Sequence, residues 1–188
     1  MRVVSGIFKG RKLFAPEDNS VRPTTDRIKE TLFNILSSKD CVGEISVLDL
    51  FGGSGALGIE ALSRGAKKVV FIDKSVESIR LIKQNLSHVK ADEKTYETFC
   101  VDYEFALKKL KDKEFDLIFA DPPYSAGLEN SIIKKVADYG VLSKNGVLVI
   151  ERSVKTKMKC APFVEDARVC GNTVLSFLSY EKEIVNNE

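Results

Sequence analysis

The chain has 188 residues, of which 44% are hydrophobic and 30% are charged, and its formal net charge at pH 7 is +2. This length predicts one domain, residues 1–188, and argues against a second one, while the apolar share is enough for a sizeable core. No long apolar stretch follows Met1 and Arg2 or occurs elsewhere, which argues against a signal peptide or a membrane helix and predicts a cytoplasmic protein.

The four cysteines are too widely spaced for a shared metal site. None of them belongs to a Cys-x-x-Cys pair, so we expect no zinc or other metal, and reduced thiols that act as small buried hydrophobes. They are Cys41, Cys100, Cys160 and Cys170.

The N-terminus carries the excess of positive charge. Residues 1–30 hold seven Lys and Arg against four Asp and Glu, whereas the remainder holds 22 against 23. The first twelve residues contain four bases and no acid: Arg2, Lys9, Arg11 and Lys12. This distribution suits contact with a phosphate backbone, although a solvated charged face would have the same pattern.

The same region has the pattern of a hairpin followed by a helix. The stretch RVVSGIFKGRKLFAP alternates around two glycines and ends at Pro16, which predicts a short β-hairpin with its basic side chains on one face. In RPTTDRIKETLFNIL the apolar residues have helical spacing, which predicts a helix over about 25–38 with a threonine as its N-cap. We therefore expect residues 1–40 to form an extension ahead of a core, residues 41–188.

From Ser46 onward, apolar runs alternate with amphipathic segments, which predicts an α/β fold with a parallel sheet. The last two runs follow each other without a helix between them, so the sheet is expected to finish with an antiparallel pair. The seven runs are SVLDLF, KVVFID, YETFCV, FDLIFAD, GVLVIE, FVEDARVCG and TVLSFLSY.

The stretch LDLFGGSGALGIEAL places a glycine loop between the first of these strands and a helix. Backbone N–H groups and the helix dipole can receive the negative end of a ligand there. The spacing Gly53-x-Gly55-x-x-Gly58 also matches the dinucleotide fingerprint, with Asp73 at the end of the second strand to bind a ribose. An NAD-dependent enzyme is therefore one interpretation.

Asp49, just before the glycines, favours a different ligand. A carboxylate at this place would face pyrophosphate unfavourably but suits an ammonium group, which S-adenosylmethionine has. In this interpretation the loop binds the methionine end, Asp73 accepts hydrogen bonds from both ribose hydroxyls, and Asp102 accepts one from the adenine amino group. Tyr103 would lie beside the adenine ring. The alternative is that these three carboxylates have only structural roles, since acids are also common in helix caps and turns.

The fourth strand ends abruptly in Asp121-Pro122-Pro123-Tyr124, because neither proline can donate to a sheet ladder. Hydrogen bonds from an exocyclic amine to the Asp121 carboxylate and the Pro122 carbonyl would turn the nitrogen lone pair toward an electrophile. Tyr124 could stack on an extruded base, so catalysis would consist mostly of positioning and electrostatics. No strong general base is then required, and we expect the lone histidine, His88, to be exposed and inert.

Four stretches together resemble the bacterial family that methylates the guanine N2 amine of 16S ribosomal RNA. They are RVVSGIFKGRKL, RPTTDRIKETLFNIL, LDLFGGSGALGIEALSRGA and DLIFADPPY. The resemblance implies a Rossmann-like, class I S-adenosylmethionine-dependent methyltransferase sheet of seven strands, the last one antiparallel, with an N-terminal β-hairpin and helix extension. It also implies S-adenosylhomocysteine as product and, as substrate, 16S rRNA in the small subunit or an assembly intermediate.

The resemblance also implies roles for individual residues. Asp121 to Tyr124 would hold the guanine amine, Arg22 and Thr24 would lie near the active site, and the four N-terminal bases would contact RNA phosphate. Tyr103 stands where the family pattern has a small residue. The implied donor-binding residues are Asp49, Gly52, Gly53, Gly55, Asp73 and Asp102.

Other functions fit parts of the same sequence. The chemistry of the fourth strand would serve any planar amine, including adenine in DNA or a protein glutamine. An oxidoreductase would need a proton-transfer residue such as Tyr-x-x-x-Lys, which the sequence lacks. A non-catalytic RNA-binding scaffold would keep the basic extension but has no use for a donor pocket. We expect a monomer.

Overall fold

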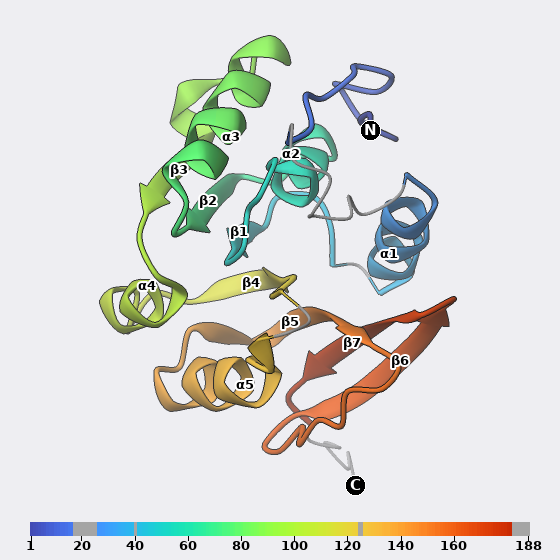
Figure 1. Ribbon diagram of the computed structural model, residues 1–188, viewed down its shortest axis with the longest axis vertical. Coiled ribbons are helices and arrows are strands. Elements are labelled where there is room, and N and C mark those ends of the chain that lie inside the picture. The colour runs from blue at the N-terminus through green and yellow to red at the C-terminus, as the bar shows by residue number, and fades with distance from the viewer. Residues whose placement is uncertain (17–25, 40, 124–125, 182–188) are drawn as a thin grey trace, which may run out of the picture.

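The computed structural model describes residues 1–16, 26–39, 41–123 and 126–181 (Figure 1). One seven-stranded sheet runs through the molecule, with helices on both of its faces. The elements in chain order are α1 (Asp26–Ser38), β1 (Ser46–Asp49), α2 (Ala56–Ser63), β2 (Lys68–Asp73), α3 (Val76–His88), the 3-10 turn η1 (Glu93–Thr95), β3 (Tyr96–Cys100), α4 (Tyr103–Lys109), β4 (Phe115–Ala120), α5 (Glu129–Asp138), β5 (Leu142–Ser153), β6 (Val164–Cys170) and β7 (Thr173–Ser179).

The strand order is β3-β2-β1-β4-β5-β7-β6. Neighbouring strands from β3 through β5 are parallel, whereas β7 is antiparallel to both β5 and β6. The predicted α/β class, the seven strands and the antiparallel end of the sheet are confirmed. Because the chain leaves β1 toward β2 and later returns to β4 on the other side of β1, a crevice opens outside the carboxyl ends of β1 and β4.

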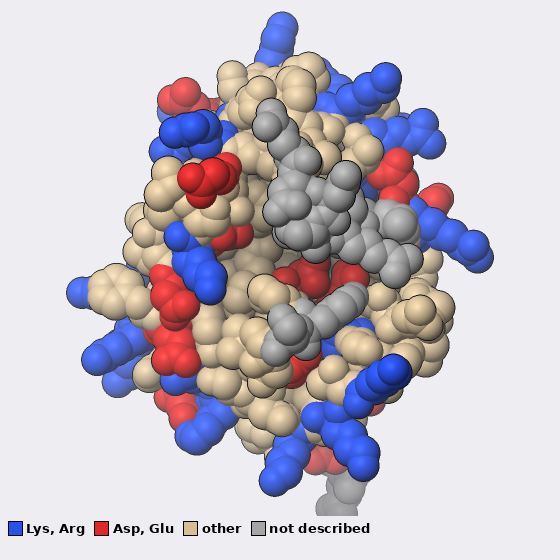
Figure 2. All heavy atoms as spheres, viewed as in Figure 1, with Lys and Arg blue, Asp and Glu red and all other residues tan. Residues whose placement is uncertain are grey.

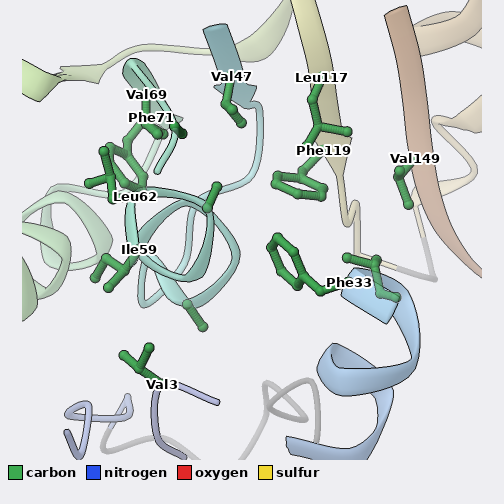
Figure 3. Packing of buried hydrophobic residues seen from close by; sticks show 14 of the residues in the cluster. Val3, Phe33, Val47, Ile59, Leu62, Val69, Phe71, Leu117, Phe119 and Val149 are labelled. Atoms are coloured by element: carbon green, nitrogen blue, oxygen red, sulfur yellow. The ribbon is translucent and has the colours of Figure 1, made fainter. Parts of the chain in front are cut away.

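Alternate residues of each strand pack on opposite faces of the sheet. One face is covered by α1, α2 and α3, and the other by α4 and α5. Figure 3 shows the first layer, in which Phe33 of α1 meets Phe119 of β4 with ring centroids 5.7 Å apart. The helix predicted over about 25–38 is confirmed as α1, Asp26–Ser38, while the threonines predicted as its N-cap lie outside the described residues. Among the described residues, no helix is both long and apolar enough to cross a bilayer.

The arm, residues 1–16, packs along α2 on the same face. Three of its side chains, Val3, Phe8 and Leu13, are buried in the hydrophobic core on this face of the sheet. Figure 3 shows Val3 pointing toward that core. The hairpin predicted here is reduced to one isolated antiparallel bridge between Arg2 and Lys12. The reason is that much of the arm's hydrogen bonding goes to α2 instead of to a second strand.

Two contacts show how closely the arm approaches α2. The Ile7 N–H donates to the Ser63 carbonyl oxygen at 2.8 Å, and the Phe8 N–H donates to Ser63 Oγ at 2.9 Å. Gly6 has a φ of 80°, and a Cβ at that position would lie 1.7 Å from the Ser63 carbonyl oxygen. Only glycine fits this backbone conformation and this contact.

A buried ion pair joins the arm to two helices. Glu60 of α2 and Lys29 of α1 are both fully buried, with Lys29 Nζ 3.4 Å from Glu60 Oε2. The Glu60 carboxylate also accepts hydrogen bonds from the Val4 and Ser5 N–H groups, at 2.7 and 2.9 Å, and Lys29 donates to the Arg2 carbonyl oxygen. Burial lowers the pKa of Lys29, while the charge of Glu60 opposes that shift. The desolvated charges are thus compensated by each other and by the arm's backbone.

Candidate active site

A cavity of about 440 Å³ lies at the carboxyl edge of the sheet, where the strand order reverses. Eight of the residues predicted for donor and amine binding line it. Pro122 and Gly55 do not line it, and Tyr124 lies outside the described residues. The lining set from the prediction is Asp49, Gly52, Gly53, Asp73, Asp102, Tyr103, Asp121 and Pro123.

The glycine loop is tied to β2 by backbone and side-chain hydrogen bonds. The Gly52 N–H donates to the Ile72 carbonyl oxygen at 2.9 Å, and the Gly53 N–H donates to Asp73 Oδ2 at 2.9 Å. Gly55 then begins α2 as its N-cap, with a φ of 79° that glycine adopts without strain. The loop is therefore fixed in place, with its backbone beside the cavity.

Asp49 is only 3% exposed at the end of β1. Burial raises the pKa of this carboxyl to about 7, and the neighbouring Asp73 charge adds to the shift, whereas the Gly58 N–H, 3.3 Å from Oδ2, opposes it. An ammonium group bound beside Asp49 would favour the ionised form and lower this pKa again. The site is thus built to gain most from a cationic ligand group.

Asp73 already serves the fold, since its Oδ2 accepts from Gly53 and its Oδ1 accepts from the Ser75 N–H at 2.9 Å. An ionised carboxylate has about four acceptor positions, so one on each oxygen is still available. Asp73 can therefore hold the loop and accept two hydroxyl groups at the same time.

Asp102 is exposed and caps α4, because its Oδ1 accepts from the Glu104 N–H at 2.8 Å. Tyr103 is buried, and its hydroxyl group forms hydrogen bonds with Glu104 and Ser131, neither of which lines the cavity. The Tyr103 ring lies 5.3 Å from the ring of Phe51, which also lines the cavity. Phe51 was not singled out from the sequence, although it stands between Asp49 and the glycines.

Asp121 follows the last residue of β4 and lines the cavity. Burial raises the pKa of its carboxyl well above the ordinary value, and the charges of Glu151 and Asp49 raise it further. Glu151 follows Ile150, which is paired with Ala120, so the sheet register places Glu151 beside Asp121. Glu151 is 8% exposed, and its only sequence signal is an acid at the end of an apolar strand.

Four acids thus meet at one edge of the sheet: Asp49, Asp73, Asp102 and Asp121. Figure 2 shows acidic side chains in the hollow at the middle of this face and basic side chains around it. Among the described residues, no group of three or more His, Cys, Asp or Glu side chains could hold a metal ion. Because like charges repel each other at close range, this cluster of acids favours protonation of a carboxyl group or the binding of a cationic ligand.

The arm's basic residues differ in how they are used. Arg2 is 3.5 Å from Asp26, and Arg11 donates to the Val89 carbonyl oxygen and lies 5.3 Å from the Phe8 ring centroid. Lys9 and Lys12 are exposed. Arg22 and Thr24 lie outside the described residues.

Both ends of the arm also reach the cavity, which the sequence did not indicate. Met1 and Pro16 line it together with Ser54 of the glycine loop. Their only sequence signal is their place at the ends of a stretch that was predicted to be a hairpin. The arm is therefore part of the cavity wall as well as a carrier of basic residues.

The sheet order and the acids along its carboxyl edge define a class I S-adenosylmethionine-dependent methyltransferase fold. A family model described as "Conserved hypothetical protein 95" matches residues 1–178. The chain is 38% identical to YlbH of Bacillus subtilis, over 84% of this chain and 85% of that protein. It is 35% identical to ribosomal RNA small subunit methyltransferase D of Haemophilus influenzae, over 80% of this chain and 78% of that protein.

Solved structures agree with these matches. The structure of yhhF from Escherichia coli superposes with a TM-score of 0.83 at 31% identity, covering 96% of this chain and 98% of that one. The chain therefore belongs to the family of the ribosomal RNA small subunit methyltransferases D.

Proposed function

We propose that this protein transfers a methyl group from S-adenosylmethionine to the exocyclic N2 amine of a guanine in 16S rRNA during maturation of the small ribosomal subunit. The observation that carries this proposal is Asp121, followed by two prolines, at the cavity that also holds the acids suited to the donor. The name of the Haemophilus influenzae relative supports rRNA as the substrate class.

The donor would be held by groups at the carboxyl edge of the sheet. Asp49 would bind its ammonium group, Asp73 its ribose hydroxyls, and Asp102 its adenine amino group, with Tyr103 and Phe51 at the adenine side. Gly52, Gly53 and Gly55 would keep the loop backbone close to the methionine end. When bound, S-adenosylmethionine supplies a methyl group that is already activated by the positive sulfur.

The protein's own contribution to the transfer is to orient the amine. The Asp121 carboxylate and the Pro122 carbonyl oxygen would accept hydrogen bonds from the two N–H bonds of the guanine amine, which turns its lone pair toward the methyl group. A nitrogen–carbon bond forms as the carbon–sulfur bond breaks, and the amine then loses one proton. Burial and the charge of Glu151 raise the pKa of Asp121, so its carboxylate is well suited to take that proton. Pro123 and Tyr124 would hold the base.

The arm would bind the RNA backbone. Lys9 and Lys12 are exposed on it and offer point charges to phosphate, and Arg2 and Arg11 would add to this surface. Arg22 and Thr24, which lie outside the described residues, would also contribute to RNA binding. Residues 1–40 would therefore bind the RNA, and residues 41–188 would carry out the methyl transfer. Both parts would belong to one domain of a cytoplasmic monomer.

The experiment that tests this function is incubation of the purified protein with methyl-labelled S-adenosylmethionine and small ribosomal subunits that lack their modifications. Nucleoside analysis of the RNA should place the label in N2-methylguanosine. Label in another nucleoside would replace the proposed target with a different planar amine. Binding of S-adenosylhomocysteine without labelling of the RNA would contradict the substrate while leaving the donor in place.

A further inference from the structure

Asn85 of α3 is a fully buried polar side chain that the proposed transfer does not use. Its neighbours on the same helix face, Ile82 and Leu86, are apolar and belong to the core. Burial of an amide costs free energy unless its hydrogen bonds are made. The partners of Asn85 therefore show why an amide stands at this position.

Asn85 bonds to two separate parts of the chain. Its Nδ2 donates to the Ser54 carbonyl oxygen at 2.8 Å and to the Phe14 carbonyl oxygen at 3.1 Å. Its Oδ1 accepts from the Phe14 N–H at 2.8 Å. One side chain thus connects the glycine loop with the C-terminal end of the arm, 71 positions away in sequence.

The two parts joined by Asn85 are also neighbours at the cavity. Ser54, Met1 and Pro16 all line it, and Ser54 Oγ lies 3.8 Å from Met1 Sδ. The Leu13 N–H donates to the Met1 carbonyl oxygen at 3.1 Å, so the two ends of the arm are held together. A donor in the cavity would therefore touch the loop and both ends of the arm.

The remaining part of the arm is held by other groups. Val4 and Ser5 bond to Glu60, and Ile7 and Phe8 bond to Ser63. The arm end, defined here as residues 13–16, has its hydrogen bonds to Asn85 and to Met1. Glu60 and Ser63 hold the first half of the arm, and Lys12 pairs with Arg2 of that half. Asn85 holds Phe14 in the arm end, which follows Lys12 directly.

We propose that Asn85 is a positioning residue that couples the donor cavity to the RNA-binding arm, so that donor and RNA strengthen each other's binding. This inference rests on the proposed function for its RNA part only. A donor that fills the cavity favours the arm end in its bonded position, and that position presents Lys12 to phosphate. Because coupling between two sites is reciprocal, RNA must raise the affinity for the donor by the same factor.

The test uses S-adenosylhomocysteine and unmodified small ribosomal subunits as the two probes. In the unaltered protein, saturating S-adenosylhomocysteine should raise the affinity for subunits by about tenfold, within the usual range of such coupling. In Asn85→Asp, which has the same shape but cannot donate to Ser54 and Phe14, the factor should fall below about twofold. The Michaelis constants for both substrates should rise while kcat changes little.

Gln84→Glu is the matched control, because it makes the same amide-to-carboxylate change at an exposed position of the same helix. It should keep the full coupling factor. An equal factor in Asn85→Asp and in the unaltered protein would overturn the proposal, even if the variant melts at a lower temperature.

A second measurement needs neither the variant nor RNA. Hydrogen exchange of the unaltered protein should show slower exchange at the Phe14 amide when S-adenosylhomocysteine is added, with no change at Val4 and Ser5. Unchanged exchange at Phe14 on saturation would contradict the coupling. If the subunits fail to bind at all, the proposed RNA substrate is wrong, and the exchange result still tests whether a ligand in the cavity stabilises the arm end at Phe14.

Discussion

The two sides of the cavity are built in different ways. On one side, Asp49, Asp73 and Asp121 stand at strand ends, and their places are fixed by the backbone register of the parallel sheet. On the other side, the arm has one β-bridge and is held by side chains of helices, above all Glu60 and Asn85. The strand-end side therefore depends on the register of the sheet, whereas the arm side depends on a few buried polar contacts.

The largest expected effect is at the strand-end side. Asp121→Ala should lower the methylation rate by about 10²- to 10³-fold, because the proposed acceptor for the reacting amine is lost. Asp121→Asn keeps one acceptor oxygen, so its methylation rate should lie between the rates of the unaltered protein and of Asp121→Ala. Affinity for S-adenosylhomocysteine, measured by calorimetry, should stay within about threefold. Full turnover by Asp121→Ala would refute the assigned role.

On the arm side, Glu60→Gln should lower the free energy of unfolding by about 3–5 kcal/mol, because it leaves Lys29 charged and buried without its partner. Urea denaturation measures this loss. Glu97→Gln is a suitable control, since it removes a partner of the half-exposed Lys68 and should cost less than about 1 kcal/mol. Equal losses in the two variants would mean that the buried pair does not hold the arm.

Asp49 should make donor binding depend on pH. Its pKa of about 7 means that the carboxyl must lose a proton before it can pair with an ammonium group. Affinity for S-adenosylhomocysteine should fall by up to about tenfold per pH unit below 7, and again above about pH 8 as the ligand's amino group loses its charge. Asp49→Asn should bind S-adenosylhomocysteine weakly, and its affinity should not fall further as the pH drops below 7. A flat profile in the unaltered protein would contradict the pairing.

The same residue gives a prediction for stability. A pKa raised on folding contributes stability that is present below the unfolded value and is lost as the pH rises to about 7. Asp49→Asn should therefore melt at a higher temperature than the unaltered protein at pH 8, with a smaller difference at pH 5. Thermal denaturation at the two pH values checks this, and the opposite order would show that the carboxylate is stabilised by other groups.

The smallest effects are expected at exposed bases of the arm. Lys9→Gln and Lys12→Gln should each weaken subunit binding by a few-fold and reduce the salt dependence by about one charge, since each phosphate contact releases about one counterion. Lys111→Gln, at an exposed position that follows α4, is the control and should leave both unchanged. If subunit binding has the same salt dependence in all three variants, the RNA does not contact Lys9 or Lys12.

Local patterns in the sequence were enough to predict the repeating secondary structure of this protein. Apolar runs predicted the seven strands and α1, because the two secondary structures impose periods that local residues reveal. The acids at the strand ends could be predicted to meet, because the carboxyl ends of parallel strands share one edge. The glycine loop and Asp121-Pro122-Pro123 also stand out in the sequence, and Gly52, Gly53, Asp121 and Pro123 do line the cavity, while their chemical roles stay a prediction.

The identity of the buried polar groups, and the segments that they hold, could be seen only in the folded chain. Lys29, Glu60 and Asn85 look like ordinary surface residues of amphipathic helices in the sequence, yet all three are fully buried. Their partners are backbone groups of the arm, up to 71 positions away, and no local period records such contacts. The raised pKa of Asp49 and of Asp121 likewise arises from burial and from neighbouring charges, which exist only once the strands are assembled.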